Sequence, residues 1–248
     1  MSNDSYQKNI ITYLKNHGFE AFTPKAVLFD MDGVLYDSMP NHVIAWRESM
    51  ALFDIHMSTE DAYATEGARG VDTIRKMVKR QQNRDIDEQE AQRMYEEKSR
   101  IFHEMKEPPM MPGILELMEK IQRSGLTINV VTGSGQRPLI QRLLRDFGLF
   151  LDENHITTAY DVKQGKPAPD PYLKGLAKAG CTNPWEAIVV ENAPLGVHAG
   201  VAARIFTIAV NTGPLPNEQL LCEGANLLFK SIAELKDEWN QFICEAIL

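Results

Sequence analysis

The stretch AVLFDMDGVLYDS at residues 26–38 places two aspartates directly after a run of apolar residues. The run Ala26–Phe29 has the length and composition of a buried strand, so Asp30 and Asp32 follow where that strand ends. In an open parallel sheet, ligands bind beyond the carboxyl ends of the strands. Two carboxylates so close together repel each other unless a hard cation such as Mg²⁺ binds one of them and a neighbouring backbone carbonyl. One carboxylate can then act as a nucleophile while the other transfers a proton.

Composition and charge exclude several classes of protein. The 248 residues suffice for one large domain, or for one domain with a smaller insert. A formal net charge of −8 argues against a partner with a phosphate backbone, and the three cysteines form no C-x-x-C pair, which suits a reducing compartment. The N-terminal residues lack a secretory apolar region, and no apolar run approaches the ~18 residues of a membrane span. We therefore expect a cytoplasmic monomer without nucleic-acid or membrane partners.

The sequence pattern divides the chain into three parts. Residues 1–24 carry apolar residues at helical spacing and predict a helical extension. Residues 39–108 contain no convincing strand and predict a helical insert, the cap, which ends in a proline-rich linker at residues 107–113. After the linker, strands alternate with helices, which is typical of a doubly wound, Rossmann-like parallel sheet. We therefore predict an α/β core of residues 25–38 and 109–248, with an α-helical cap domain inserted after its first strand.

Three later loops follow predicted strands as the two aspartates do. The loop from Thr132 to Gly135 offers a hydroxyl and glycines that let backbone N–H groups approach an anion. Lys166 lies between a glycine and a proline, which places it more rigidly than a surface lysine. Glu191 and Asn192 follow a buried strand, and their oxygens could join the shell of a metal ion. If the sheet is parallel, all these groups share one rim with the two aspartates.

Each loop also has an ordinary interpretation. Asp and Gly are common in any turn after a strand, and hydroxyl and glycine residues fill many strand-to-helix turns. A single lysine is usually at the surface, and Asn192 is a good N-cap for a helix. Together, however, the loops bring two aspartates, a hydroxyl, a lysine and a Glu-Asn pair to one rim in chain order.

The order of these motifs resembles that of the haloacid dehalogenase superfamily of phosphohydrolases and phosphomutases. Within it, the chain is most similar to the β-phosphoglucomutase-like branch, which carries a helical cap after the first strand. The matching segments are residues 30–38, 130–134, 165–170 and 189–196. The resemblance covers nearly everything from residue 26 to residue 229, and it implies an enzyme with the fold predicted above.

The resemblance implies roles for the acidic and amide residues. Asp30 would attack phosphorus and form an aspartyl-phosphate. Asp32 would protonate the leaving group and then deprotonate the incoming water or hydroxyl. Mg²⁺ would be held by the Asp30 carboxylate, the backbone carbonyl of Asp32 and Asn192. Glu191 would support the site by anchoring Lys166 or the waters of the metal.

The resemblance also implies which residues hold the substrate. Thr132 and Lys166 would hold the transferring phosphoryl group, whose spread charge needs fixed donors and cations. His42, on the first cap helix, resembles a histidine that mutases place near the hinge. It could form a hydrogen bond across the domain interface and respond to closure, or it could be a structural helix histidine. The candidates for substrate contact are Gly33, Ser38, His42, Glu66, Arg69, Gly133 and Ser134.

One position departs from the family pattern. Where the fourth motif commonly carries an acid, this chain has Asn192, and the lost negative charge should weaken Mg²⁺ binding unless another ligand compensates. Glu66, in a glycine-flanked cap loop, is the candidate ligand: it could reach the metal and exclude bulky sugar phosphates, or it could be a solvated loop glutamate. Arg69 in the same loop could hold an anionic end of the substrate. This arrangement resembles the pyrophosphate-hydrolysing members of the branch.

These observations rank three functions. The first is a Mg²⁺-dependent phosphohydrolase that acts through an aspartyl-phosphate on a small soluble phosphate, with inorganic pyrophosphate the first candidate and a sugar phosphate the second. The next is a phosphomutase such as β-phosphoglucomutase, whose aspartyl-phosphate must outlast attack by water; the acidic Glu66 favours hydrolysis. The last is a non-catalytic phosphate-binding protein, which would not need both Asp30 and Asp32.

Overall fold

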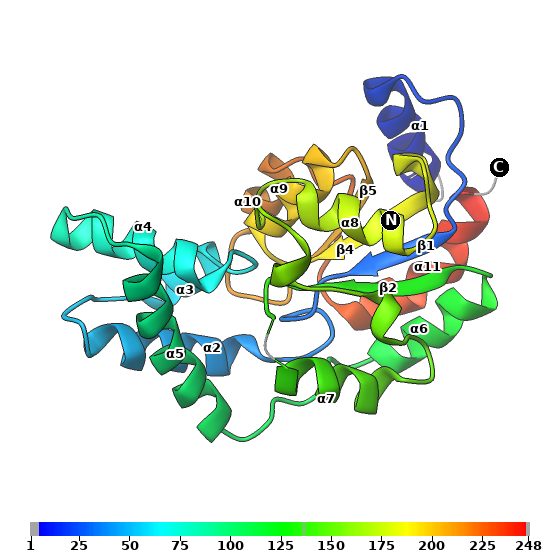
Figure 1. Ribbon diagram of the computed structural model, residues 1–248. Coiled ribbons are helices and arrows are strands. Elements are labelled where there is room, and N and C mark those ends of the chain that lie inside the picture. Colours follow the sequence, from blue (N-terminus) through cyan, green and yellow to red (C-terminus); the bar gives the residue numbers. More distant parts are fainter. Residues whose placement is uncertain (1–4, 136, 247–248) are drawn as a thin grey trace.

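The computed structural model describes residues 5–135 and 137–246, and it is built around a sheet of six parallel strands (Figure 1). The strands are β1 (Ala26–Phe29), β2 (Thr127–Val131), β3 (Ile156–Thr157), β4 (Ala187–Glu191), β5 (Phe206–Val210) and β6 (Leu227–Phe229). In space they follow the order β3-β2-β1-β4-β5-β6. β1 pairs with β2 on one side and with β4 on the other. The chain therefore reverses its path across the sheet beside β1, which is where such sheets form their ligand crevice.

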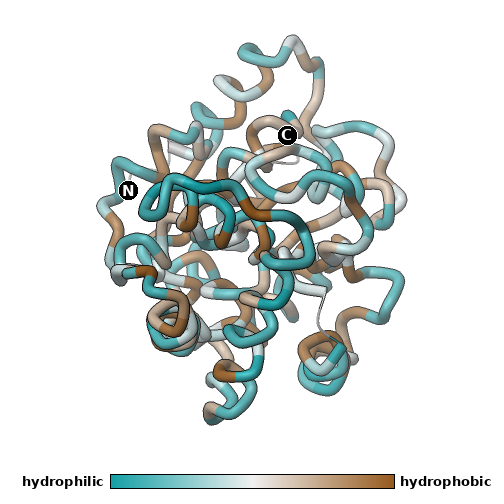
Figure 2. The backbone as a smooth tube through the Cα atoms, turned by 60° about the vertical axis from the view of Figure 1, so that its left-hand side comes forward, coloured by the Kyte–Doolittle hydropathy of each residue, from teal (hydrophilic) through white to brown (hydrophobic). Residues whose placement is uncertain are grey.

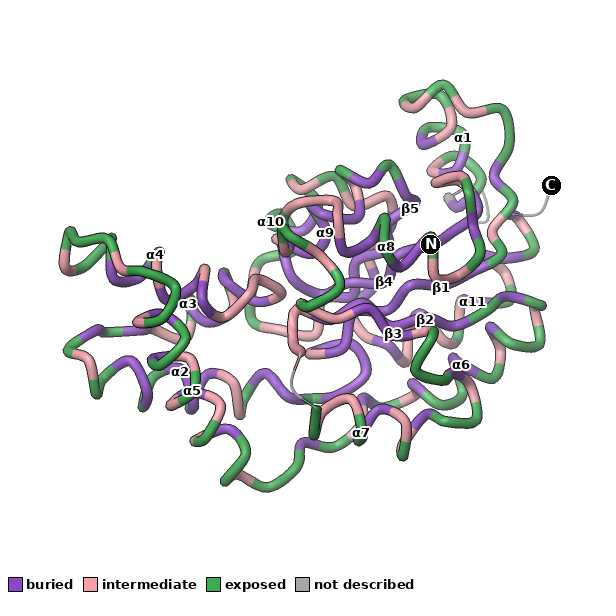
Figure 3. The backbone as a smooth tube through the Cα atoms, in the orientation of Figure 1, coloured by how far each residue is buried: buried purple, intermediate pink, exposed green. Residues whose placement is uncertain are grey.

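Helices cover both faces of this sheet, which confirms the doubly wound α/β core (Figure 1). The strands are largely buried on both faces (Figure 3), and this explains why their sequences are mostly apolar. None of the helices in residues 5–135 and 137–246 is long and apolar enough to cross a membrane. One face carries α1 (Ser5–His17), α6 (Ile114–Arg123), α7 (Arg137–Phe147) and α11 (Ile232–Ala246), and the other carries α8 (Asp170–Lys178), α9 (Pro194–Ala202) and α10 (Asn217–Cys222).

The predicted helical cap lies between β1 and β2 in the chain and beside the sheet in space (Figure 1). Hydrophobic and hydrophilic residues alternate along the helical turns (Figure 2), so each cap helix can turn an apolar face inward. Trp46, Ile74, Met77 and Met94 belong to the apolar cluster inside the cap, which is separate from that of the sheet. The cap helices are α2 (Met39–Ala51), α3 (Thr59–Ala64), α4 (Gly70–Gln82) and α5 (Glu88–Glu104).

Two short segments connect the cap to the core, and they lie side by side. The backbone N–H of Asp37 in the outgoing segment donates to the carbonyl of Pro109 in the returning segment at 2.9 Å. The Arg142 guanidinium of α7 lies 4.0 Å from the ring centre of Tyr36 and donates to the carbonyl of Pro108. Both segments are thus attached to the same core helix, and α7 begins just after the loop that follows β2.

The N-terminal extension forms a helix that packs against the core. Tyr6, Ile10 and Tyr13 of α1 are buried, and the Tyr13 hydroxyl donates to the carbonyl of Arg204 at 2.8 Å. Residues 1–4 of the extension lie outside the described part of the chain. The division into extension, core and cap at residues 24, 38 and 108 remains a prediction.

Candidate active site

The carboxyl ends of β1, β2 and β4 meet around the side chain of Lys166. Its ammonium donates to the Asp30 carboxylate at 2.5 Å, to the Glu191 carboxylate at 2.7 Å and to the carbonyl of Val131 at 3.1 Å. All of these side chains are buried. The lysine that sequence placed only near the rim is therefore the centre of a buried charge cluster, which we call the core cluster: Asp30, Lys166, Glu191 and Tyr172.

Glu191 is fully occupied in holding this cluster together. One carboxylate oxygen accepts from Lys166 and from the Tyr172 hydroxyl, the latter at 2.9 Å. The other accepts from the backbone N–H groups of Asn192 at 2.9 Å and Ala193 at 3.0 Å. Of the two supporting roles predicted for Glu191, these contacts favour the anchoring of Lys166. Tyr172 was not singled out by the sequence, because a tyrosine on an amphipathic helix has the pattern of a core residue.

The core cluster carries an excess of negative charge. Burial raises the pKa of the Asp30 carboxyl to about 8, because the attraction of Lys166 does not offset burial and the nearby carboxylates. For Lys166 the balance is reversed: burial opposes the charge, but the neighbouring carboxylates hold the pKa of the ammonium above its ordinary value. The site would therefore be stabilised by a further cation beside Asp30.

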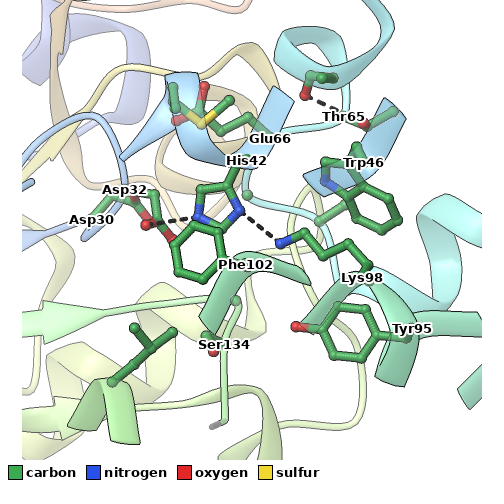
Figure 4. Close-up of a pocket in the computed structure, with 17 residues that line it drawn as sticks. Asp30, Asp32, His42, Trp46, Thr65, Glu66, Tyr95, Lys98, Phe102 and Ser134 are labelled. Atoms are coloured by element: carbon green, nitrogen blue, oxygen red, sulfur yellow. Dashed lines mark hydrogen bonds and ion pairs between the residues drawn. The ribbon is translucent and has the colours of Figure 1, made fainter. Parts of the chain in front are cut away.

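Asp32 belongs to a second charge cluster that crosses from core to cap (Figure 4). Its carboxylate accepts from the Ser38 hydroxyl at 2.6 Å and lies 3.0 Å from His42 Nε2. The other ring nitrogen of His42 lies 2.7 Å from the ammonium of Lys98. We call Asp32, His42 and Lys98 the cap cluster. The prediction that His42 bonds across the domain interface is thus met by its contact with Asp32.

The three side chains of the cap cluster shift one another's pKa values. Burial alone would raise the pKa of Asp32, but the attraction of His42 and hydrogen bonds from His42 and Ser38 lower it to about 2. Burial and the repulsion of Lys98 lower the pKa of His42, and burial lowers the pKa of Lys98 to about 8 although Asp32 opposes this. Asp32 is therefore held ionised and able to accept a proton.

Lys98 is a functional candidate that the sequence did not reveal. It lies on the polar helix α5, where it has the pattern of a surface lysine, yet only 4% of it is exposed. Its ammonium lies 5.1, 5.9 and 5.0 Å from the ring centres of Trp46, Tyr95 and Phe102, a setting that favours a cation. The usable signal was the spacing of Tyr95, Lys98 and Phe102, which puts the three on one helix face.

Glu66 reaches from the cap into the rim of the core. It is buried, and one carboxylate oxygen accepts from the side-chain amide of Asn192 at 2.8 Å. Burial and the neighbouring carboxylates raise the pKa of Glu66 well above its ordinary value, although the hydrogen bond from Asn192 opposes this. The interpretation of Glu66 as a solvated loop residue is therefore wrong. The N-cap interpretation of Asn192 is also wrong, because Ala193 holds that position before α9.

The donor set at this point fits a hard cation. The side-chain carbonyl oxygen of Asn192 is buried and has no hydrogen-bond partner, and it adjoins the carboxylates whose pKa values are raised. Among the described residues, no group of three or more His, Cys, Asp or Glu side chains is arranged to hold a metal. The fit rests instead on a mixed set of carboxylate, amide and backbone oxygens, which is the kind of set that Mg²⁺ accepts.

A small cavity of about 70 Å³ lies between the cap and the core. Thr132, which precedes the lining residue Gly133, is buried, and its hydroxyl accepts from the backbone N–H of Ser134 at 3.0 Å. Arg69 is not in this cavity: it forms a two-point ion pair with Asp72 at 2.7 and 3.0 Å and lines a separate cavity of about 730 Å³. Of the predicted site residues, Asp30, Asp32, His42, Glu66, Gly133 and Ser134 line the small cavity.

Gly33 takes part in the site through its backbone. It has a positive φ of 78°, as the tight turn between Asp30 and the cap requires. Its carbonyl accepts from the Thr212 hydroxyl at 2.7 Å. Thr212 follows β5, so a further strand-end loop supports the turn that carries Asp32. A lone threonine after a strand gave no signal of this role.

Comparison with known proteins identifies the family. A model of haloacid dehalogenase-like hydrolases matches residues 24–204. Because this is well over half of the chain, the protein belongs to the haloacid dehalogenase-like hydrolase family. The chain is an enzyme of the phosphatase or phosphomutase type.

Individual relatives agree with this assignment. The chain is 33% identical over 192 residues to hexitol phosphatase A of Escherichia coli (strain K12), an alignment that covers 75% of this chain and 83% of the relative. It is 24% identical over 228 residues to the beta-phosphoglucomutase of Bacillus subtilis (strain 168), covering 88% and 96%. A solved structure from Bacteroides vulgatus, described as a candidate beta-phosphoglucomutase, superposes with a TM-score of 0.95 at 47% identity and covers 100% of both chains.

Proposed function

We propose that this enzyme is a Mg²⁺-dependent phosphohydrolase that acts through an aspartyl-phosphate on a compact phosphate, with inorganic pyrophosphate the first candidate. The observation that carries the proposal is the Glu66 carboxylate, buried at the cavity beside Asn192 and the two aspartates. A carboxylate in that place adds a ligand for a cation. It also repels the second phosphate of a sugar bisphosphate, which a mutase has to accommodate.

The chemistry divides into two displacements at phosphorus. A carboxylate oxygen of Asp30 attacks, the bond from phosphorus to the leaving group breaks, and the phosphoryl group is held as a mixed anhydride on Asp30. Water then attacks the same phosphorus while Asp32 accepts its proton. The bond to Asp30 breaks, phosphate leaves, the Asp30 carboxylate is restored, and Asp32 releases the proton to the departing phosphate or to solvent. Asp32, held ionised by the cap cluster, is suited to the second step.

The charge of the transferring group is balanced by residues already in place. Thr132 and Lys166 would hold the phosphoryl oxygens, because phosphoryl transfer depends on fixed donors and cations rather than on further covalent help. The carboxylates of Asp30 and Glu66, together with oxygens of Asn192 and the Asp32 backbone, would hold Mg²⁺. When bound, the ion neutralises the developing charge on the phosphoryl oxygens.

Two observations favour pyrophosphate over a sugar phosphate. The cavity of about 70 Å³ leaves little room for a sugar ring in addition to a phosphoryl group. In addition, the pKa of Asp32 is about 2, so its carboxyl group is ionised near neutral pH and carries no proton to donate. It therefore suits a leaving group that needs little protonation, as phosphate does and a sugar hydroxyl does not.

A sugar phosphate is the second candidate substrate, and a phosphomutase is the second candidate function. Both are supported by relatives, through the names hexitol phosphatase A and beta-phosphoglucomutase. A non-catalytic binding role is disfavoured, because binding alone does not require a second aspartate beside the first. A cytoplasmic location, a monomeric state and the absence of nucleic-acid or membrane partners remain predictions.

The test is a substrate panel assayed with Mg²⁺. Phosphate release is measured from pyrophosphate, hexose phosphates and phosphonates, beside the isomerisation of β-glucose 1-phosphate by the same preparation. We expect release from pyrophosphate to be fastest and isomerisation to be negligible. Fast isomerisation with little phosphate release would overturn the proposal in favour of the mutase.

A further inference from the structure

The segment that carries Glu66 rests directly on glycines of the core. We call residues 66–69 the cap loop. At three core positions, a methyl group added to a glycine would lie within contact distance of this loop. The three glycines belong to three different strand-end loops: a methyl on Gly33 would lie 3.0 Å from a carboxylate oxygen of Glu66, one on Gly133 2.8 Å from the carbonyl oxygen of Gly67, and one on Gly165 2.6 Å from Cγ of Arg69.

Gly133 differs from the other two in what it faces. A methyl on Gly33 would first meet the side chain of Asn192 and only then Glu66, whereas a methyl on Gly165 would first meet the side chain of Arg69. These neighbours are side chains, which can rotate away. Gly133 faces backbone: besides the Gly67 carbonyl at 2.8 Å, the carbonyl oxygen of Ala68 would lie 3.4 Å from an added methyl. Its own φ is not in the left-handed region, so its backbone conformation does not require glycine. The close approach of the cap loop is what requires it.

The distance between the cap loop and Gly133 affects the size of the small cavity. Glu66, Gly67 and Ala68 form part of the cavity wall on the cap side, and Gly133 faces them from the core side. A cap loop held further from Gly133 would enlarge the cavity and would withdraw Glu66 from Asn192. Both features that favour a compact substrate therefore depend on the same contact.

We propose that Gly133 is a specificity-determining residue: by lacking a side chain it lets the cap loop seat on the loop after β2, which keeps the cavity too small for sugar phosphates. The inference rests on the proposed function and names the core residue that sets its substrate size. It gives Gly133 a role in seating the cap, besides the phosphate contact predicted from its motif.

The test is the Gly133→Ala variant, compared with the wild type on pyrophosphate and on glucose 6-phosphate. Nonbonded heavy atoms pack at about 3.5 Å, so the Gly67 carbonyl would have to retreat by roughly 0.7 Å. Displacements near 1 Å can cost about a hundredfold in rate. We expect the ratio of kcat/KM for pyrophosphate to that for glucose 6-phosphate to fall at least about tenfold, mainly through loss of the pyrophosphate rate.

A matched control is Gly213→Ala. Gly213 is also a core glycine that meets the cap, because an added methyl would lie 3.0 Å from the ring of Tyr63 on α3. It does not line the small cavity, and a ring edge can shift by a few tenths of an ångström. We expect this variant to keep the wild-type substrate ratio. A tenfold change in Gly213→Ala as well would overturn the specific role of Gly133, since any strain between cap and core would then suffice.

The remaining outcomes are also decisive. A folded Gly133→Ala protein with the wild-type ratio overturns the inference, and so does an equal loss on every substrate, which would indicate that Gly133 only holds the shared phosphoryl group. If the variant does not fold, the wild type is assayed on a series of phosphate monoesters of increasing size, from methyl phosphate to hexose phosphates. The inference requires the rates to fall steeply as the substrate becomes larger, and equal rates overturn it.

The proposed function can also fail alone. A wild type that turns over acetyl phosphate but not pyrophosphate would refute the proposed function, and Gly133→Ala is then tested by the ratio of kcat/KM for acetyl phosphate to that for glucose 6-phosphate.

Discussion

The two aspartates at the end of β1 lie two residues apart but belong to different clusters: the one around Asp30 is buried, and the one around Asp32 is partly exposed. The core cluster around Asp30 is built entirely from residues of the core, through Lys166 and Glu191. The cap cluster around Asp32 is completed by Lys98 on α5, which reaches Asp32 through His42 (Figure 4). The contacts that position Asp30, the proposed nucleophile, therefore come from the core alone, whereas the surroundings of Asp32, the proposed proton acceptor, depend on the cap.

The two clusters also differ in charge. In the core cluster two carboxylates share one ammonium, and the pKa of Asp30 is raised to about 8. In the cap cluster one carboxylate faces a basic pair, and the pKa of Asp32 is lowered to about 2. A cation is thus needed on the Asp30 side, where Glu66 and Asn192 meet. Because each aspartate has its own partners, one short segment carries two carboxyl groups whose pKa values are shifted in opposite directions. The proposed mechanism uses this difference, with Asp30 as the nucleophile beside a metal ion and Asp32 as a separate base.

The largest expected effect comes from replacing Asp30, the proposed nucleophile of the core cluster. Asp30→Asn keeps the shape of the side chain but cannot form the anhydride, so we expect kcat to fall by at least about 10⁴, the scale of nucleophile removal in other enzymes. Phosphate release by the purified variant measures it. Substantial turnover by Asp30→Asn would show that phosphorus is attacked by another group.

Lys166→Met tests the ammonium that holds the core cluster together. Two buried carboxylates would lose their shared partner, so we expect the free energy of unfolding to fall by about 3–5 kcal/mol and kcat to fall by about 10²–10³. Urea denaturation and phosphate release measure the two effects. As a control, Lys79→Met breaks an exposed ion pair with Asp85 at 2.8 Å and should cost less than about 1 kcal/mol. Equal losses of stability in both variants would contradict the burial argument.

Glu66→Gln tests whether the cap supplies a metal ligand to the core cluster. The amide keeps the size of the side chain and removes its charge, so we expect the Mg²⁺ concentration for half-maximal rate to rise by about 10–100-fold, the usual cost of losing a group that supports a metal. A titration of Mg²⁺ into chelator-treated protein measures the shift. If the Mg²⁺ requirement and the rate are both unchanged, Glu66 does not act on the metal side.

Lys98→Met tests the cap cluster and has the smallest expected effect on rate, a fall in kcat of about tenfold, because it acts on Asp32 only through His42. Burial lowers the pKa of Lys98 to about 8, so its charge is present below that pH and is lost above it. In the wild type, kcat should therefore decline as pH rises through about 8, and in Lys98→Met this decline should be absent. A basic limb that persists unchanged in the variant would remove Lys98 from the mechanism.

The sequence predicted the core cluster better than the cap cluster, and the reason is geometric. Parallel strands bring the residues that follow them to one edge, so Asp30, Thr132 and Asn192 could be placed together from their positions after apolar runs. Lys166 could be added because its neighbours restrict it. No comparable rule says which face of a cap helix meets the core, so Lys98 on a charged helix could not be told from a surface lysine.

Residues that support the site through a backbone group or through a second residue could not be predicted from the sequence either. Thr212 supports the Gly33 carbonyl and Tyr172 supports Glu191, and neither lies in a motif. Arg69 was expected to face the substrate, but its guanidinium pairs with Asp72 three residues on, a local contact that competes with any role in the small cavity. Side-chain pairing of this kind depends on coordinates rather than on pattern.

The account depends most directly on a phosphoryl group passing through Asp30. The decisive measurement is acid quenching of the enzyme during turnover of ³²P-labelled pyrophosphate, followed by mapping of the labelled peptide. The account predicts label on the peptide that contains Asp30 and its loss at alkaline pH, as expected of an acyl phosphate. Label on another residue, or full turnover with no covalent label at any quench time, would contradict it.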